Sequence, residues 1–327
     1  MKHHMETKSN KPMPFKHISD SATEILNYID KRRRKLINPL VTRWPKFNKL
    51  IGGGFEWGTV ISIAGISGSG KSSFINTLET DLIDLNPKED LVILAFSFEM
   101  ISAKQVGRKL SYKLKKTTSE LYSGESLISD IEYDYIESTT DDIKEYPIYY
   151  VDDPGTVEDI ESTISFFQET IAKNKWLIVT IDHTLLVNGA EGERAIIANL
   201  QKTLIRRKKI GKTTIIQLSQ MNRNIESTDR INNPLLHYPQ RGDLSSSDSV
   251  FQGSDIVIVI HRPEILGLMS YGVKNMSVKD AIYLHFLKNR EGSIKILRFI
   301  NDLKYNNIKE PEDDDPQGQQ QIDFKKE

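Results

Sequence analysis

The stretch Gly65-Ile66-Ser67-Gly68-Ser69-Gly70-Lys71-Ser72 decides the fold, because it matches the pattern G-x-x-x-x-G-K-[ST] at every position. The β-branched and apolar residues 59–64 before it predict a buried strand. After it, apolar residues recur at helical spacing: Phe74, Ile75, Leu78 and Leu82. A strand, a glycine-rich turn and a helix start are the context that this motif requires. The stretch therefore predicts a phosphate-binding loop.

The chemistry of the loop suits an anionic phosphate chain. Backbone N–H groups at a helix N-terminus face the ligand, and glycine permits a close wrap that a Cβ would forbid. Lys71 is expected to reach the β/γ-phosphates, and the Ser72 hydroxyl to ligate Mg²⁺. The other residues expected to hold the nucleotide are Gly65, Ser67, Gly68, Ser69, Gly70 and Ser73. The alternative is a glycine-rich turn that binds nothing, but the lysine, the serine and the flanking pattern favour a nucleoside triphosphate.

Composition limits the class of protein. The chain has 327 residues, 38% of them apolar, which allows one large domain or two small ones with polar tails. It carries 44 Lys and Arg against 45 Asp and Glu, so a nucleic-acid surface would be a local patch. It has no cysteine, which excludes disulfides and thiolate chemistry. No segment has the length and apolarity of a membrane span, so we expect no membrane partner.

Polar side chains follow several predicted strands, at the point where each strand ends. Glu99 follows strand 91–97 and is placed to act as a general base; the alternative is a helix-capping acid. Asp182 ends strand 176–182, and in phosphate-loop NTPases such an acid holds Mg²⁺. Gln220 follows the next strand and can hydrogen-bond the γ-phosphate or its attacking water; the alternative is a surface glutamine.

Predicted strands alternate with predicted helices along the chain. Further strands are expected at 147–151, 213–218, 255–260, 281–287 and 294–300. This alternation is typical of a parallel sheet with helices on both faces. We therefore expect an α/β fold, a P-loop NTPase core with a mainly parallel twisted sheet flanked by helices.

The ends of the chain differ from its centre. Residues 1–17 and the acidic tail 305–327 are expected to be disordered, and the tail from residue 310 onward to be dispensable for hydrolysis. Within 18–41, a helix is expected behind a capping residue, with an apolar stripe. The stripe consists of Ala22, Ile25, Leu26, Ile29 and Leu36. The basic run 31–35 near its end is a solvated face, a phosphate contact or a docking site for a neighbouring subunit.

From about residue 42 to 304, the order of motifs resembles the RecA-like ATPase domain of the DnaB-like replicative DNA helicases (superfamily 4). The matching segments are residues 53–58, the phosphate loop, 96–100, the strand ending at Asp182, 218–223, 243–255 and 288–292. One such motif is weak evidence, but the whole series in order and at sensible spacing is specific.

The resemblance implies an ATP-dependent DNA helicase that translocates on single-stranded DNA and unwinds duplex DNA during DNA replication. It implies a homo-oligomeric ring, usually a hexamer, with ATP and Mg²⁺ between subunits. Carried over by position, Glu99 is the catalytic base and Gln220 the γ-phosphate sensor. Lys288 and Arg290 would reach into the neighbour's site, where an arginine finger stabilises charge that develops in the transition state. The helix within 18–41 matches the linker helix that packs on the adjacent subunit.

The resemblance also implies that loops 188–194 and 241–252 grip single-stranded DNA. The family's second DNA loop commonly runs Asp-Leu-Arg-Glu-Ser-Gly, whereas this chain has Asp-Leu-Ser-Ser-Ser-Asp at 243–248, without the arginine. Backbone N–H groups and the hydroxyls of Ser245, Ser246 and Ser247 can still bind phosphates. Arg194 or Arg241 can compensate for the lost charge.

Two other classes stay open. A RecA-type recombination ATPase would use the same core in a filament, and a DNA-stimulated non-motor ATPase scaffold would suit the altered loop. The globular N-terminal domain of the family does not precede these motifs, which leaves a primase or helicase loader as an open partner. The short chain suits a phage-encoded helicase that acts in the host cytoplasm.

Overall fold

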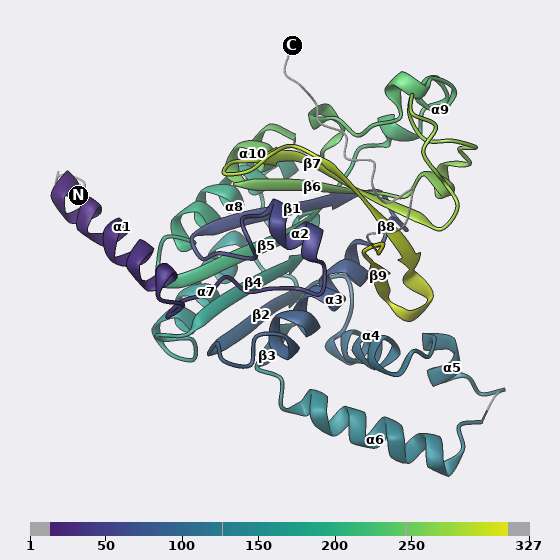
Figure 1. The fold of residues 1–327 in the computed structure, drawn as a ribbon, viewed down its shortest axis with the longest axis horizontal. Coiled ribbons are helices and arrows are strands. Elements are labelled where there is room, and N and C mark those ends of the chain that lie inside the picture. The colour runs from purple at the N-terminus through teal and green to yellow at the C-terminus, as the bar shows by residue number, and fades with distance from the viewer. Residues whose placement is uncertain (1–13, 126, 246, 313–327) are drawn as a thin grey trace, which may run out of the picture. The chain divides into compact units, whose positions relative to one another are not determined.

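A single nine-stranded sheet organises residues 40–312 of the computed structural model, which describes residues 14–125, 127–245 and 247–312 (Figure 1). The strand order is β3-β2-β4-β5-β1-β6-β7-β8-β9. The strands are β1 (Thr59–Gly65), β2 (Leu91–Ser97), β3 (Ile148–Val151), β4 (Trp176–Asp182), β5 (Lys212–Gln220), β6 (Ile256–His261), β7 (Ala281–Asn289), β8 (Ile296–Asp302) and β9 (Asn307–Lys309). From β3 through β6 neighbouring strands are parallel, and from β6 through β9 they are antiparallel. The expected α/β fold with a mainly parallel sheet is confirmed.

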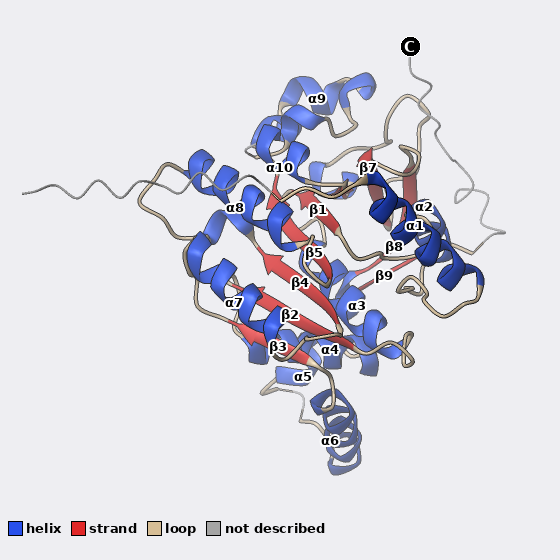
Figure 2. Cartoon of the chain, turned by 90° about the vertical axis from the view of Figure 1, so that its left-hand side faces the viewer, coloured by secondary structure: helices blue, strands red, loops and turns tan. Residues whose placement is uncertain are grey.

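Helices cover both faces of this sheet (Figure 2). The helices of this unit are α2 (Pro45–Leu50), α3 (Lys71–Asp84), α4 (Ser102–Leu114), α5 (Thr118–Tyr122), α6 (Asp130–Lys144), α7 (Val157–Glu169), α8 (Glu193–Arg207), α9 (Thr228–Asn232) and α10 (Ser247–Gly253). Alternate residues of the central strands point to opposite faces. On β1, Ile61 and Ile63 pack with α2 and α3, whereas Val60 packs with α7 and α8. None of the helices in the described residues is long and apolar enough to cross a membrane.

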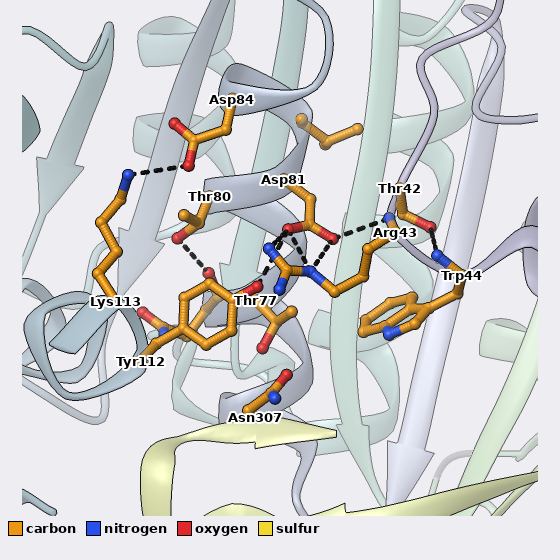
Figure 3. A network of polar contacts seen from close by, with 12 residues as sticks. Thr42, Arg43, Trp44, Thr77, Thr80, Asp81, Asp84, Tyr112, Lys113 and Asn307 are labelled. Atoms are coloured by element: carbon orange, nitrogen blue, oxygen red, sulfur yellow. Dashed lines mark hydrogen bonds and ion pairs between the residues drawn. The ribbon is translucent and has the colours of Figure 1, made fainter. Parts of the chain in front are cut away.

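A buried carboxylate fixes the segment before β1 onto the phosphate-loop helix α3 (Figure 3). Asp81 is fully buried and accepts hydrogen bonds from Nε, Nη2 and the backbone N–H of Arg43. Tyr112 of α4 donates its hydroxyl to the same carboxylate at 3.3 Å. The guanidinium carbon of Arg43 lies 4.6 Å from the centre of the Tyr112 ring. This bidentate, multiply hydrogen-bonded geometry compensates a buried charge and links three segments distant in sequence.

The N-terminal residues form a separate unit, Met1–Pro39, whose described part contains helix α1 (Ile18–Arg33). The sequence prediction of a helix is confirmed, but the helix is shorter than the segment 18–41. Lys35 adopts a left-handed φ of 54°, which ends the helical path. Leu40 is fully buried and pairs with Phe55, so residues 40 and 41 belong with the sheet unit.

The predicted boundary of the acidic tail at residue 305 is wrong. Residues 307–309 form strand β9, which pairs with β8, and Ile308 is fully buried. Glu310 accepts hydrogen bonds from the backbone N–H groups of Lys46 and Phe47 at 2.8 and 2.9 Å. Burial of one apolar side chain and this helix cap hold the segment in place. The prediction for residues 1–13 and 313–327 lies outside the described residues.

Candidate active site

The carboxyl ends of the parallel strands bring the predicted catalytic residues to one edge of the sheet. Gly65 at the end of β1 lies opposite Gln220 of β5, and Ser97 of β2 lies opposite Asp182 of β4. Because β5 also pairs with β4, these strand ends are contiguous. Glu99 follows β2 directly, so the phosphate loop, Glu99, Asp182 and Gln220 share this edge. This is the edge at which open parallel sheets bind ligands.

The phosphate loop adopts backbone angles that favour glycine. Gly68 and Gly70 have φ values of 75° and 103°, in the left-handed region. A Cβ on Gly65 would lie 2.4 Å from Ser69 Oγ, so a side chain there would displace the loop. Lys71 begins α3 and donates from Nζ to the carbonyls of Gly65 and Ile66, at 2.7 and 2.9 Å. The motif therefore folds into a compact turn at a helix N-terminus.

The loop fits a phosphate chain by an observation beyond its sequence. The hydroxyl of Ser69 is buried and has no hydrogen-bond partner within the described residues. Burial lowers the pKa of Lys71, and the carboxylates of Asp182 and Glu99 oppose that effect. A buried donor and an ammonium that has lost part of its hydration both gain from an anionic oxygen. Ser67, Ser72 and Ser73 belong to the same loop and the first turn of α3.

Asp182 has the surroundings of a metal ligand. Its side chain is hydrogen-bonded to that of Ser72, and burial followed by repulsion from Glu99 raises its pKa to about 6. A divalent cation at this point would restore the charged form, and a hydroxyl with one carboxylate is a typical protein contribution to a nucleotide-bound Mg²⁺. Within the described residues, no group of three or more histidine and acidic side chains forms a stand-alone metal site. Ser72 and Asp182 therefore fit Mg²⁺ that arrives with phosphates.

Glu99 is the accessible carboxylate of the pair. Its side chain is 57% exposed, and Oε2 lies 3.9 Å from Nε2 of His183. In contrast, the Asp182 residue is only 8% exposed. A general base must reach a water molecule from solvent, whereas a metal ligand is held rigidly, so the two environments match the two predicted roles.

The sequence analysis missed two residues of the site, Arg108 and His183. Arg108 lies on α4, where burial lowers its pKa and the charges of Asp182 and Glu99 oppose that effect. Its Nη1 atom is buried without a hydrogen-bond partner in the described part of the chain. His183 follows Asp182 directly, and its Nε2 lies 3.1 Å from Nε2 of Gln220. Its position beside the strand-terminal acid was a usable signal, whereas Arg108 stands in a lysine-rich helix and carried none.

Lys288 and Arg290 lie at the opposite edge of the sheet from the phosphate loop. Strand β7 is antiparallel to β6, so its end returns to the amino-terminal edge. Arg290 forms an ion pair of 2.9 Å with Asp255, which also accepts a hydrogen bond from the backbone N–H of Val60, near the start of β1. Five residues of extended strand, roughly 17 Å, separate Val60 from Gly65. Lys288 donates to the carbonyl of Phe251 at 2.7 Å. Neither side chain joins the site of its own subunit.

The predicted DNA-binding residues follow the strands that end at the active-site edge. Ser245 donates its backbone N–H to the carbonyl of Gln220 at 3.0 Å, so the second loop is attached to the predicted γ-phosphate sensor. Arg241 is exposed, pairs with Asp248 at 2.5 Å and lies over the ring of Phe251. Arg194 is exposed on the first turn of α8, where the sequence predicted a loop.

Two serines of the second loop have no described side chain. Ser246 lies outside the described residues, and Ser247 begins α10 with no description of its side chain.

Comparison with known proteins places this geometry in a family. A sequence model of the DnaB-like helicase C terminal domain matches residues 40–310. The chain is 28% identical over 238 residues to "Replicative DNA helicase DnaB" of Mycoplasma genitalium, covering 71% of this chain and 48% of that protein. It is 25% identical over 263 residues to "Probable replicative DNA helicase" of Trieres chinensis, covering 77% and 53%. The chain thus spans about half the length of the curated relatives it matches.

Solved structures show the same fold. One of them, an isolated ATPase domain, superposes with a TM-score of 0.77 at 17% identity, over 91% of this chain and 100% of that chain. "The Structure Of A DnaB-Like Replicative Helicase And Its Interactions With Primase" gives 0.73 at 17% identity, over 91% and 68%. The expected RecA-like core is confirmed. Since the family match runs from residue 40 to residue 310, this chain belongs to the family of the DnaB-like helicase C terminal domain.

Proposed function

We propose that this protein is an ATP-dependent helicase that translocates on single-stranded DNA and separates duplex DNA during replication. The observation that carries the proposal is the division of the predicted machinery between two edges of one sheet. The phosphate loop, Glu99, Asp182 and Gln220 share one edge, and Arg290 lies at the other. One copy therefore holds both halves of a composite site but cannot join them, which suits an enzyme that works between copies.

In the proposed site each side chain has one task. Lys71 and the loop N–H groups hold the β- and γ-phosphates, and Ser72 with Asp182 holds Mg²⁺. The bound ion neutralises charge on the phosphates. Glu99 accepts a proton from the attacking water, and Gln220 hydrogen-bonds the γ-phosphate.

The position of Arg290 supports a homo-oligomeric ring. With copies arranged head to tail, the amino-terminal edge of one sheet faces the phosphate edge of the next, and Arg290 acts as the arginine finger with Lys288 beside it. Helix α1 supports the assembly, because Ile25, Leu26 and Ile29 are each more than half exposed. We infer that this apolar stripe docks on the neighbouring copy, and that the ring is a hexamer as in the family.

Single-stranded DNA is proposed to run past loops 188–194 and 241–252. The hydrogen bond from the backbone N–H of Ser245 to the carbonyl of Gln220 supports this, because it links the γ-phosphate sensor to the second loop. Arg194 supplies exposed positive charge on the first loop. Arg241 is neutralised by Asp248, so backbone N–H groups and the loop serines carry more of the phosphate contact there.

Partners and place of action follow from the relatives. One solved relative is described with its interactions with primase, which makes a primase or a helicase loader a proposed partner of this protein. We infer that it acts in the cytoplasm, in the host cytoplasm if the gene is carried by a phage.

The experiment is strand separation on a forked duplex with one labelled strand, with and without ATP, together with ATPase rates with and without single-stranded DNA. We expect release of the labelled strand only with ATP, and faster hydrolysis with DNA. Lys71→Ala is the matched inactive control. DNA-stimulated hydrolysis without strand release would instead support a non-motor ATPase scaffold, which the ion-paired Arg241 favours. Filaments on DNA with strand exchange would support a RecA-type recombination ATPase.

A further inference from the structure

His183 occupies a central place in the candidate active site. It follows the end of β4, is 6% exposed, and directs Nε2 toward two functional side chains. Nε2 lies 3.1 Å from Nε2 of Gln220 and 3.9 Å from Oε2 of Glu99. One imidazole nitrogen thus faces both the predicted γ-phosphate sensor and the predicted base.

We propose that His183 is a positioning residue that holds the Gln220 amide for the γ-phosphate and couples the sensor to Glu99. The proposal rests on the proposed function only in taking ATP as the substrate. It assigns no proton transfer to the imidazole. Its content is that γ-phosphate recognition by Gln220 depends on the hydrogen bond with His183.

Hydrogen-bond chemistry supports this role. A side-chain amide carries two N–H donors and one carbonyl acceptor, and a neutral imidazole carries one donor and one acceptor. When Nε2 of His183 accepts from one amide N–H of Gln220, the second N–H remains for an anionic oxygen. In the opposite arrangement Nε2–H donates to the amide oxygen, and both amide N–H groups remain. In either arrangement the imidazole fixes the amide and leaves it a donor for phosphate.

Burial argues against a purely packing role for His183. Its Nδ1 atom is buried and has no hydrogen-bond partner in the residues that the structure describes. A buried polar atom without a partner costs stability, and an aromatic ring of similar shape without nitrogens would avoid that cost. The imidazole nitrogen that is used points at Gln220, so the hydrogen bond to the sensor is the feature that distinguishes histidine from phenylalanine at this position.

The contact with Glu99 completes the coupling. At 3.9 Å the imidazole and the carboxylate lie beyond hydrogen-bond distance but adjacent. A movement of the Gln220 amide toward a phosphate therefore moves the ring against the base. This arrangement predicts that His183 affects turnover and γ-phosphate recognition together, and leaves the grip on the α- and β-phosphates unchanged.

The test compares the affinity of the whole chain for the non-hydrolysable analogue AMP-PNP with its affinity for ADP. The variants are His183→Phe, His183→Gln, Gln220→Leu and the double variant with Phe and Leu. We expect His183→Phe to reduce the AMP-PNP-to-ADP affinity ratio and kcat by about tenfold, with ADP affinity unchanged. His183→Gln, which restores a polar group, should recover most of the loss. The double variant should match Gln220→Leu alone, because the two residues act as one unit.

A ratio within twofold of wild type in His183→Phe, or losses that add in the double variant, would overturn the inference. If His183→Phe also loses ADP affinity, the comparison of His183→Gln with wild type decides in the same way. Nucleotide binding is measured without DNA, so this result is separate from the proposed function. A wild-type protein that prefers AMP-PNP but never separates strands would contradict only the helicase proposal.

Discussion

Two carboxylates at the same edge of the sheet differ in their surroundings, and this difference sets their roles. Asp182 is buried, is hydrogen-bonded to Ser72 and has a pKa raised to about 6 by burial and by Glu99. Glu99 has an exposed side chain. A rigid, buried acid beside the phosphate loop suits a cation, whereas an exposed acid can meet water. The division of labour is thus a property of environment rather than of residue type.

The first prediction concerns Glu99. Glu99→Gln keeps the shape of the side chain and removes the base, so turnover should fall by about 10² or more while ATP affinity stays unchanged. Steady-state ATPase rates and titration of a fluorescent ATP analogue measure the two quantities. Lys71→Ala is the matched contrast, because it should weaken the binding of the analogue itself. Turnover within a few-fold of wild type would show that Glu99 is a structural cap.

The phosphate loop was predictable because all its residues are adjacent in sequence, and its strand and helix context is local. Glu99, Asp182 and Gln220 were predictable as strand-terminal residues, and the structure brings them to one edge. Arg108 was not predictable, because only the packing of α4 brings it to the site. Local sequence carries no record of such a contact. The roles assigned to these residues stay predictions.

At the scale of elements, the short helix α2 depends on a residue more than 260 positions away. Its own N-cap, Trp44, provides no side-chain hydrogen bond. The Glu310 carboxylate accepts hydrogen bonds from two backbone N–H groups of the first turn instead. A negative charge at a helix N-terminus is also favourable to the helix dipole. The chain after β9 therefore closes the element that precedes β1.

The second prediction separates this cap from the residues that follow it. Glu310→Ala should lower the free energy of unfolding by about 1 kcal/mol, the usual cost of a lost helix cap. Deletion of residues 313–327, which are acidic and poor in apolar side chains, should leave stability and basal ATPase unchanged. Urea unfolding and ATPase rates are the measurements. Equal stability of Glu310→Ala and wild type would remove the cap from the account.

A buried cluster at the end of β6 makes stability depend on pH. The Tyr271 hydroxyl lies 2.8 Å from Nδ1 of His261 and 2.7 Å from Nε2 of His285, and all three side chains are buried. Burial, and then the charges of Arg230 and His237, lower the pKa of His261 to about 3. The unfolded chain, with a histidine pKa of about 6.5, binds the proton first.

The third prediction follows from that sign. The stability due to neutral His261 is complete above about pH 6.5 and is lost progressively as the pH falls toward 3. The free energy of unfolding should therefore fall between about pH 7.5 and pH 5. His261→Gln is the control, because it keeps a polar group that does not titrate and should show a smaller fall. Equal pH dependence of the two proteins would contradict the assignment.

Long, apolar elements were predicted well from sequence, and short ones were not. The central strands and α3 have clear apolar periodicity. Strand β9 has three residues and no such pattern, and it forms because β8 offers an edge and Ile308 enters the core. Helix α10 was read as part of a loop for the same reason, since its seven residues owe their conformation to packing against α8.

At the scale of the whole molecule, the antiparallel turn of β7 has the largest consequence. It returns the chain to the amino-terminal edge and leaves Arg290 beside Asp255, while the phosphate loop stays at the other edge. A rigid sheet cannot bring the two together within one copy. The fold therefore requires a second copy wherever an arginine at this position acts on the γ-phosphate, and this is the central claim of the account.

The fourth prediction tests that claim by mixing two inactive variants, Lys71→Ala and Arg290→Ala. Each variant alone should lose ATPase activity, the second by about 10³-fold or more. In mixed assemblies some interfaces pair an intact phosphate loop with an intact arginine, so activity should partly return. Co-purification of differently tagged variants checks that they assemble together. Partial recovery on mixing is the predicted result, and full-rate hydrolysis by wild-type protein that remains monomeric would contradict the account.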